Sequence, residues 1–363
     1  MYLKRLSASN FKNLKEIRLE FSPKINCISG RNGSGKTNLL DAIYYLSVTK
    51  SFFSSGDGAV ISHNRDESAL HGEYLREDGT GENISVGISR NGEKSIKRNA
   101  KSYQRLSDHV GLIPVVMVSP SDSALINDSG EERRRFLNSI LSQVDKEYLR
   151  RLQKYNHLLS ARNRLLKSSD ISFDVIEAVS LQMSDLAKYI NTRRAEFCSS
   201  LEPVSARYYE KISGGREEIS IKYRSDLSER DLLSLFEENF ERDRMLHYTT
   251  CGIQRDDMLF ELEGWPIRKF GSQGQQKSFL LALKMAQFEI MQKIYGKAPL
   301  LLLDDVFDKL DMQRVQYLLH LVAQDGFGQI FITDSNKVRL DSLLNEVGGE
   351  SISIEIDGGE VCL

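Results

Sequence analysis

A glycine-rich octapeptide near the N-terminus constrains the fold of this chain more than any other stretch. It follows the pattern glycine, four residues, glycine, lysine, then serine or threonine, and reads Gly30-Arg31-Asn32-Gly33-Ser34-Gly35-Lys36-Thr37. The apolar run 25–29 before it predicts a short buried strand, and residues 37–46 carry leucine and isoleucine at helical spacing. A strand, a glycine-rich loop and a helix in this order predict a phosphate-binding loop in an α/β fold.

The residue types of this loop suit the phosphates of a nucleotide. Glycines let consecutive backbone N–H groups turn toward phosphate oxygens, and the helix that begins near Lys36 adds the positive end of its dipole. We expect Lys36 to reach the β- and γ-phosphates of ATP, and the hydroxyl of Thr37 to bind Mg²⁺. The other expected nucleotide contacts are Gly30, Arg31, Asn32, Gly33, Ser34, Gly35 and Asn38. The alternative is a glycine-rich turn with a solvated lysine, which leaves the flanking strand and helix unexplained.

Two adjacent carboxylates nearer the C-terminus form a second element of such a site. The run Leu300-Leu301-Leu302-Leu303 predicts a buried strand, and Asp304 and Asp305 follow it directly. Carboxylate oxygens are preferred ligands of Mg²⁺, so we expect Asp304 to hold the ion, directly or through water, and Asp305 to orient or deprotonate the attacking water. The alternative is a strand followed by a helix-capping aspartate, but two consecutive acids at a strand end are costly without a cation.

A third element is Gly271-Ser272-Gln273-Gly274-Gln275-Gln276-Lys277, which is followed by apolar residues at helical spacing. It resembles the Ser-Gly-Gly-Gln signature of ABC-type ATPases, in which the serine hydroxyl and the helix N-terminus face the γ-phosphate held by a second molecule. This resemblance implies nucleotide contacts from Ser272, Gly274 and Gln275. The alternative is a serine N-cap beside a glycine-rich turn, a role that Ser272 would fill in any helix.

Composition narrows the class of protein. Among 363 residues, Lys and Arg number 49 against 51 Asp and Glu, so any basic surface has to be local. The four cysteines form no Cys-x-x-Cys pair and the six histidines show no ligand spacing beside them, which predicts reduced thiols and no zinc site. The N-terminus enters an alternating strand pattern without an apolar signal core, and no apolar run is long enough to span a membrane. We expect a soluble, cytoplasmic protein with no membrane partner.

The predicted elements divide the chain into a split head and an insertion. Residues 131–211 have helical composition and spacing, and Pro203 within them predicts a break. Alternating or β-branched patterns predict strands over 3–8, 17–21, 69–74, 83–90, 95–98, 115–118, 219–223 and 329–333, and 232–245 predicts one more helix. We therefore expect a head formed by residues 1–125 and 247–363 and a helical arm formed by residues 126–246.

Together these motifs resemble the RecF family of bacterial recombination mediator ATPases, nearly from end to end. The phosphate loop, the turn Asn10-Phe11-Lys12-Asn13 and the stretch 271–277 are characteristic in combination, and Ser119-Pro120, residues 133–137 and residues 250–257 recur in that family in related form. Several positions depart from the family pattern. No glutamine stands at 118–122, no switch histidine follows the last strand, where Thr333 is the substitute candidate, and Ile253-Gln254, Ser121 and Asp308-Lys309 replace the usual residues.

The resemblance implies an α/β fold, namely an ABC-type P-loop head with an antiparallel β subregion and an inserted helical arm, related to SMC-type ATPases. It also implies that two copies close on two ATP molecules, so that Asp305, Lys36 and Ser272 are the expected catalytic residues and Asp311 contacts the nucleotide from the D-loop. Because Asp305 is shorter than the glutamate of many relatives, we expect slow hydrolysis. The helical part spans about 80 residues, so two helices of about 40 residues would reach about 60 Å, which is too short for a long SMC coiled coil.

The partners that the resemblance implies are double-stranded and gapped DNA and a RecR-type mediator protein. A local charge excess supports the first of them: between residues 131 and 167, ten basic residues oppose four acids, a balance of +6. The basic residues expected to contact DNA are Arg133, Arg134, Arg135, Arg150 and Arg151. The alternative interpretation of this segment is a solvated helical arm.

Three other functions remain open at this level. A transporter-type or SMC-like ATPase subunit would act without the recombination role, and the former would have a membrane partner. A toprim-type nuclease would need a further acidic metal cluster, and the sequence shows none. A purely structural arm protein would be unaffected by Lys36→Met.

Overall fold

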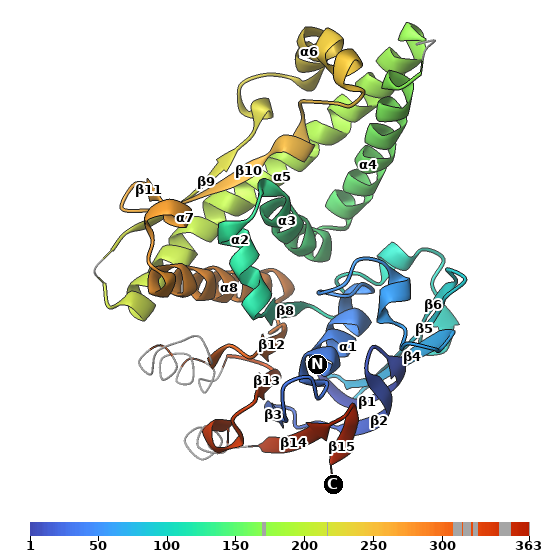
Figure 1. Ribbon diagram of the computed structural model, residues 1–363, viewed down its shortest axis with the longest axis vertical. Coiled ribbons are helices and arrows are strands. Elements are labelled where there is room, and N and C mark those ends of the chain that lie inside the picture. The colour runs from blue at the N-terminus through green and yellow to red at the C-terminus, as the bar shows by residue number, and fades with distance from the viewer. Residues whose placement is uncertain are drawn as a thin grey trace. The chain divides into compact units, whose positions relative to one another are not determined.

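The computed structural model describes residues 1–168, 172–215, 217–307, 314, 321, 326–340 and 350–362. It divides into two compact units, which are shown together in Figure 1. Unit 1 consists of Met1–Asp122 and Gln287–Leu363, and unit 2 of Ser123–Ala286.

The first sheet of unit 1 is antiparallel and has the strand order β2-β1-β4-β5-β6-β7. Apolar and polar residues alternate along its strands, so that one face is buried in the core. The strands predicted over 3–8 and 17–21 are confirmed as parts of β1 and β2, which form a hairpin with Phe11 opposite Leu14 at its turn. The bounds are β1 Tyr2–Phe11, β2 Leu14–Glu20, β4 Glu67–Leu75, β5 Gly81–Ser89, β6 Lys94–Arg98 and β7 Lys101–Ser102.

The second sheet of unit 1 has the order β15-β14-β3-β13-β12-β8 and is parallel except for β15 at its edge. Strands β3, β8, β12 and β13 are buried at every position and mainly apolar, as expected for a parallel sheet covered on both faces. The bounds are β3 Ile25–Ser29, β8 Val115–Val118, β12 Leu300–Asp304, β13 Ile330–Asp334, β14 Ser351–Asp357 and β15 Glu360–Cys362.

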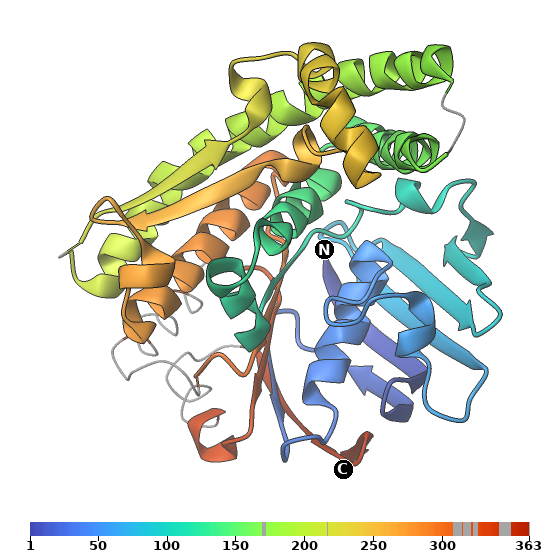
Figure 2. The same cartoon turned by 45° about the horizontal axis from the view of Figure 1, so that its top comes forward.

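Helix α1 (Lys36–Val48) follows the glycine-rich loop and contacts strands of both sheets, as Figure 2 shows. Leu39, Ile43 and Leu46 are fully buried in one core cluster with residues of both sheets. The loop is therefore fixed by the core at both ends, through β3 before it and α1 after it. Short 3₁₀ helices of unit 1 are η1 Asp57–Val60, η2 Leu106–Asp108 and η3 Pro120–Ser123, which reaches the start of unit 2.

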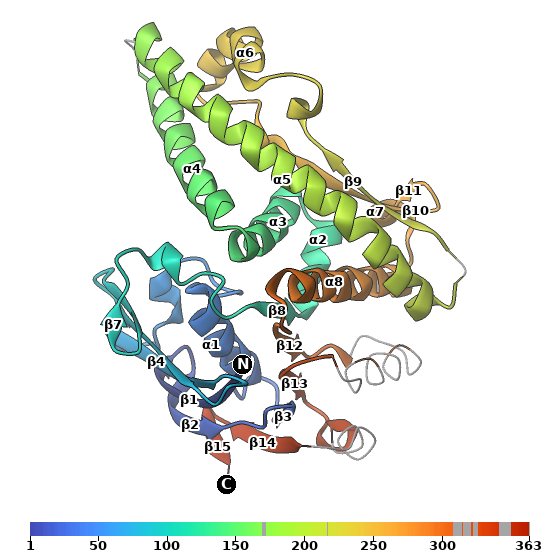
Figure 3. The ribbon, with the colours of Figure 1, turned by 180° about the vertical axis from the view of Figure 1, so that it is seen from behind.

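Unit 2 is mainly helical, and α4 packs along the long helix α5 (Figures 1 and 3). A three-stranded antiparallel sheet, β11-β10-β9, lies beside α5 through β9. The helices are α2 Ala124–Asn127, α3 Gly130–Val144, α4 Lys146–Leu166, α5 Phe173–Ser213, α6 Leu232–Leu246, α7 Ile267–Phe270 and α8 Gln273–Tyr295, which continues into unit 1. The remaining elements are β9 Ile219–Arg224, η4 Asp226–Ser228, η5 Ile253–Arg255, β10 Asp257–Leu262 and β11 Trp265–Pro266.

The expected break at Pro203 is wrong, because α5 runs through Pro203 for 41 residues. Tertiary packing overrides the local cost of the proline, since α5 is held by α4 on one side and by β9 on another. The arm is also not a pair of equally long helices. Asp145 separates α3 from α4 by capping α4, its side chain accepting from the backbone N–H of Tyr148.

Unit 2, which contains the arm, ends at Ala286, later than the predicted end of the arm at residue 246. Residues 247–286 group with unit 2, because β10 pairs with β9 over its whole length. None of the helices in the described ranges combines the length and apolar character that a membrane span requires.

Candidate nucleotide-binding site

The carboxyl ends of three neighbouring parallel strands bring the predicted motifs of unit 1 together. The glycine-rich loop follows β3, the carboxylates follow β12, and β13 lies between these two strands. In the register of the sheet, Thr333 is opposite both Asp304 and Ile28. The loop and the acids therefore share the edge at which open α/β sheets bind ligands.

Glycine is required at two positions of the loop. Gly30 has a φ of 154°, and a Cβ there would lie 2.2 Å from the carbonyl oxygen of Ile356. Gly35, at the N-cap of α1, has a φ of 119° in the left-handed region that side chains disfavour. The loop thus presses against β14 on one side and starts the helix on the other.

Two buried polar groups of the loop, the ammonium of Lys36 and the hydroxyl of Ser34, could contact a ligand. Lys36 is 6% exposed, and its ammonium donates to the carbonyl oxygens of Gly30 at 2.8 Å and Arg31 at 3.1 Å. No carboxylate of the described residues forms an ion pair with it. The hydroxyl of Ser34 is buried, and no hydrogen-bond partner for it lies within the same described residues. An ammonium that hydrogen-bonds only to backbone carbonyls and a hydroxyl donor without a partner fit phosphate oxygens.

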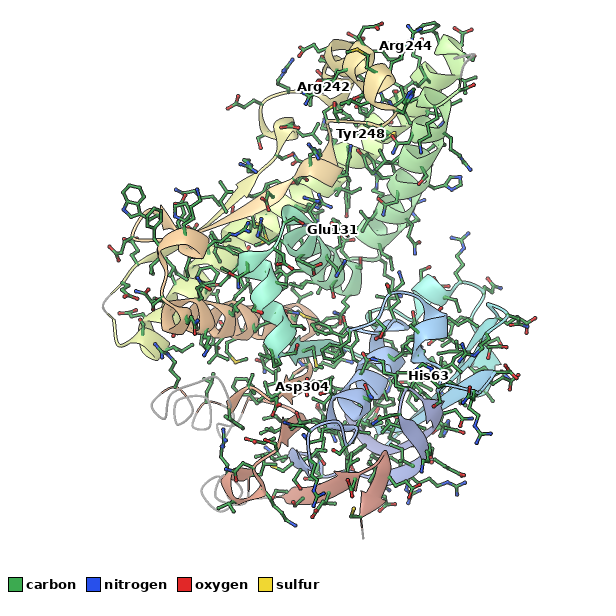
Figure 4. The ribbon with its side chains drawn as sticks, viewed as in Figure 1. His63, Glu131, Arg242, Arg244, Tyr248 and Asp304 are labelled. Carbon is green, nitrogen blue, oxygen red and sulfur yellow. The ribbon has the colours of Figure 1, made fainter. Side chains whose placement is uncertain are left out.

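A chain of hydroxyl and carboxylate groups joins the loop to the two acids, and Figure 4 marks Asp304 within it. The hydroxyl of Thr37 donates to Asp304, 2.9 Å from Oδ1 and 3.1 Å from Oδ2. The hydroxyl of Thr333 donates to Asp304 Oδ1 at 2.8 Å and accepts from the backbone N–H of Asp305 at 3.0 Å. Thr37 and Asp304 are therefore adjacent, as a shared Mg²⁺ would require.

Burial raises the pKa of the Asp304 carboxyl above its usual value, and the charge of Asp305 acts in the same direction. The hydrogen bonds from Thr333 and Thr37 oppose this effect. A carboxylate held in this way gains a counter-charge when a cation binds. The described residues contain no group of three or more His, Cys, Asp or Glu that could form a metal cage by themselves. One carboxylate and one hydroxyl beside phosphate oxygens are the usual donors for Mg²⁺.

Asp305 is held in an unusual backbone conformation. Its φ is 50°, and its N–H is directed to Thr333. Its Oδ1 is buried, and no hydrogen-bond partner for this atom is present in the part of the chain that the structure describes. A strained residue with an unused acceptor is a common feature of functional sites.

Thr333, the substitute candidate for the sensor of the γ-phosphate, is bound to both acids of the site. Its side chain is fully buried, and its hydroxyl already serves Asp304 and Asp305. Thr333 is therefore a positioning residue for both acids. The D-loop residues Asp308, Lys309 and Asp311 lie outside the described residues.

The turn 10–13 supports the phosphate loop through side-chain contacts. From the sequence, this turn was significant only as part of the family resemblance. Asn13 donates to the carbonyl oxygen of Gly33 at 3.1 Å and accepts from Asn38 at 2.7 Å. Lys12 forms an ion pair of 2.7 Å with Asp41 of α1, whose side chain is fully buried. The spacing of apolar residues does not predict such contacts. The only indication in the sequence is that two polar residues, Lys12 and Asn13, stand in a tight turn before the phosphate loop.

The signature segment lies in unit 2 and forms a capping box at the start of α8. The backbone N–H of Ser272 donates to Gln275 Oε1 at 2.6 Å, and the N–H of Gln275 lies 3.3 Å from the Ser272 hydroxyl. Gln275 also donates to Glu217 at 2.5 Å. Ser272 therefore caps α8, which is the alternative role that the sequence predicted for it. Because Ser272 is exposed at the N-terminus of a 23-residue helix, this role is compatible with binding an external anion.

The arginine triplet at the start of α3 is mostly structural. Arg133 forms a two-bond ion pair with Asp257, at 2.7 and 3.1 Å, and Arg134 donates to the carbonyl oxygen of Asp256 at 2.8 Å. Burial lowers the pKa of Arg134. The side chain of Arg133 is only 12% exposed. Both residues tie α3 to β10, which corrects the expectation that they belong to a free basic face.

The other three expected DNA contacts are accessible but partly neutralised. Arg135 is paired with Glu131 and Glu132. Arg150 and Arg151 share Glu147, and their hydrogen bonds lower the pKa of Glu147 to about 2. Part of the positive charge of residues 131–167 is therefore neutralised locally by ion pairs, which the composition of the segment does not show.

This chain is similar in sequence to known proteins over nearly its full length. The family described as RecF/RecN/SMC N terminal domain matches residues 2–348. The DNA replication and repair protein RecF of Bacteroides thetaiotaomicron is 44% identical, over 99% of this chain and 98% of its own length. The protein of the same description from Flavobacterium johnsoniae is 42% identical, over 95% and 97%.

Solved structures give the same result. The recombination mediator protein RecF with ATP, of the RecFOR pathway, is similar with a TM-score of 0.90 and 29% identity, over 99% of this chain and 97% of that one. The Smc head domain of Pyrococcus furiosus has a TM-score of 0.57 at 17% identity, over 99% of this chain and 95% of its own, which indicates a shared fold. The fold is therefore the α/β ABC-type ATPase head that was expected. This chain belongs to the RecF family.

Proposed function

We propose that this chain binds ATP with Mg²⁺ at its phosphate loop, hydrolyses it slowly, and dimerises while ATP is bound. On this proposal it acts in recombinational repair, where it binds double-stranded DNA at gaps or junctions and promotes recombinase loading with a RecR-type partner. The observation that carries the ATPase assignment is the hydrogen-bonded chain of Thr37, Asp304, Thr333 and Asp305, beside the loop whose Lys36 ammonium contacts only backbone carbonyl oxygens. The family relationship supports the pathway assignment.

The residues divide the chemistry between them. Lys36 leaves the carbonyl oxygens of Gly30 and Arg31 and donates to phosphate oxygens. Thr37 and Asp304 would hold Mg²⁺, which when bound offsets the negative charge that develops on the phosphates. The carboxylate of Asp305 orients the attacking water and accepts its proton. Thr333 keeps both acids in place.

In the proposed dimer, the signature segment of each copy contacts the ATP held by the other copy. In this arrangement, Ser272 of one copy donates to the γ-phosphate held by the other, and the positive end of α8 favours the same charge. Hydrolysis removes the group that Ser272 contacts, so the pair loosens and the DNA is released. Support for this step comes from the exposure of Ser272 at a helix N-terminus.

The direct test of the ATPase assignment is hydrolysis and binding measured on the same variants. Asp305→Asn should bind ATP as the wild type does but lose hydrolysis by about 100-fold or more, because the base is removed and the fold is kept. Lys36→Met should lose nucleotide binding itself. The shorter reach of Asp305 predicts that Asp305→Glu hydrolyses at least as fast as the wild type. Hydrolysis at the wild-type rate by Asp305→Asn would contradict the assignment.

A further inference from the structure

The only tryptophan of the chain forms an exposed aromatic pair in unit 2. Trp265 is 61% exposed and Phe270 is 63% exposed, and their ring centroids lie 5.3 Å apart. Two large aromatic rings that contact each other in water mark an interaction site more often than an isolated apolar side chain does.

This pair is fixed to the signature segment by short, well-anchored connections. Trp265 is paired with Leu262 in β11-β10, and Phe270 ends α7, whose Ile267 is buried. The N–H of Gly271 donates to the carbonyl oxygen of Ile267 at 2.9 Å. The side chain of Gln276, in the first turn of α8, donates to the carbonyl oxygens of Ile267 at 3.3 Å and Gly271 at 3.1 Å. Figure 1 shows β11 and α7 together. The rings therefore keep a constant position relative to Ser272.

The residues between the two rings carry positive charge. Arg268 and Lys269 are exposed, and neither forms an ion pair within the described ranges of the chain. The positive end of α8 follows them directly. We call Trp265, Arg268, Lys269 and Phe270 the Trp265 patch. Its chemistry fits a partner that offers negative charge beside a surface that the rings can cover.

We propose that the Trp265 patch is buried against a second copy of this chain when two ATP-bound copies close. This rests on the proposed function, in which Ser272 meets the γ-phosphate held by the second copy. A surface rigidly joined to Ser272 through Gly271 enters the same interface, and the phosphates carried by the second copy supply the negative charge. The aromatic pair then contributes the apolar contact that a capping serine cannot provide.

The single tryptophan makes this testable by fluorescence. In Asp305→Asn, which retains ATP, Mg²⁺ and ATP should shift the emission of Trp265 to the blue and reduce its quenching by acrylamide, while ADP should not. Phe270→Ala in the same background should weaken ATP-dependent dimerisation by roughly tenfold to a hundredfold in light scattering. Tyr248→Ala is the matched control, because Tyr248 is an exposed aromatic residue of unit 2 remote in sequence from the patch, and should leave dimerisation unchanged (Figure 4).

The outcomes separate this inference from the proposed function. A dimer that forms with ATP while Trp265 stays equally accessible would overturn the inference and leave the ATP-dependent dimer standing. The absence of any ATP-dependent dimer would overturn both. Protection of Trp265 by duplex DNA without nucleotide, and not by ATP, would identify DNA as the occupant and would also overturn the inference.

Discussion

At the scale of single residues, the site is held by hydroxyl groups around a buried acid. Thr37 and Thr333 both donate to Asp304, and the backbone N–H of Asp305 is held by Thr333. The arrangement satisfies Asp304 by hydrogen bonds but buries its negative charge beside Asp305, which raises its pKa. Such a site favours ligand binding at some cost to the stability of the nucleotide-free protein.

Asp304→Asn should stabilise the nucleotide-free protein by about 1–2 kcal/mol at neutral pH, because it removes a buried charge and retains an acceptor for both threonines. The pKa of Asp304 is raised in the folded state, so its favourable contribution is present below the ordinary carboxyl pKa and is lost as pH rises through the raised value. Urea unfolding without nucleotide, at mildly acidic and neutral pH, measures this. The variant should also lose the extra stability that Mg²⁺ and ATP confer on the wild type. Identical pH profiles for variant and wild type would show that the pKa of Asp304 is not raised by folding.

Much of the site follows from the sequence, because each motif is joined directly to a strand. Lys36, Thr37 and Asp304 follow β3 and β12, and parallel strands in one sheet bring their carboxyl ends to one edge. The contacts of Asn13 with Gly33 and Asn38 could not be predicted, since they depend on where the hairpin turn packs. The hydrogen bonds of Thr333 with both acids could not be predicted for a similar reason, because they depend on the register of β13 beside β12.

At the scale of elements, the arm shows how packing changes the meaning of local patterns. Periodicity identified the helices, but α5 passes through Pro203 because its neighbours hold it. The net charge of residues 131–167 indicated one basic face. Arg133, however, forms an ion pair with Asp257, more than 100 residues further along the chain. Long-range partners of this kind are not encoded in segment composition.

Pro203→Ala should stabilise unit 2, because the exposed proline removes one helical hydrogen bond and its ring crowds the preceding turn. We expect a gain of about 1–3 kcal/mol in the free energy of unfolding, measured by urea denaturation. Exposed Ser200→Ala in the same helix is a control and should change stability by less than about 1 kcal/mol. A loss of stability in Pro203→Ala would mean that the helix needs the proline geometry.

We expect a DNA-binding surface on α4, because this helix carries exposed basic residues. Lys154 and Arg164 are exposed on α4, and neither forms an ion pair within the described residues. The double variant Lys154→Glu, Arg164→Glu should lower duplex DNA affinity and reduce the slope of log affinity against log salt by about 2, because two phosphate contacts are lost. Titrations at several salt concentrations measure this slope.

Arg133→Ala is the informative control for that experiment. It should leave the salt slope unchanged and instead cost about 2 kcal/mol of stability, because it leaves Asp257 without its main partner. An altered slope in Arg133→Ala with an unchanged slope in the α4 variant would place the DNA surface on α3.

At the scale of the whole molecule, the predicted ATPase motifs are divided between two compact units. The phosphate loop and both acids belong to unit 1, and Ser272 belongs to unit 2. In the proposed dimer, each nucleotide is contacted by unit 1 of one copy and unit 2 of the other. The family and the α/β head could be predicted from the sequence, but the unit boundary could not, because it depends on β10 pairing with β9.

The most direct test of the ATP-dependent dimer is the solution mass of Asp305→Asn by light scattering, with and without ATP and Mg²⁺. Ser272→Asp in that background keeps an N-cap oxygen but places negative charge against the γ-phosphate, and Ser272→Thr keeps both the cap and the hydroxyl. The account predicts a dimer only with ATP, lost in Ser272→Asp and kept in Ser272→Thr. A monomer under all conditions, or a dimer that Ser272→Asp leaves intact, would contradict it.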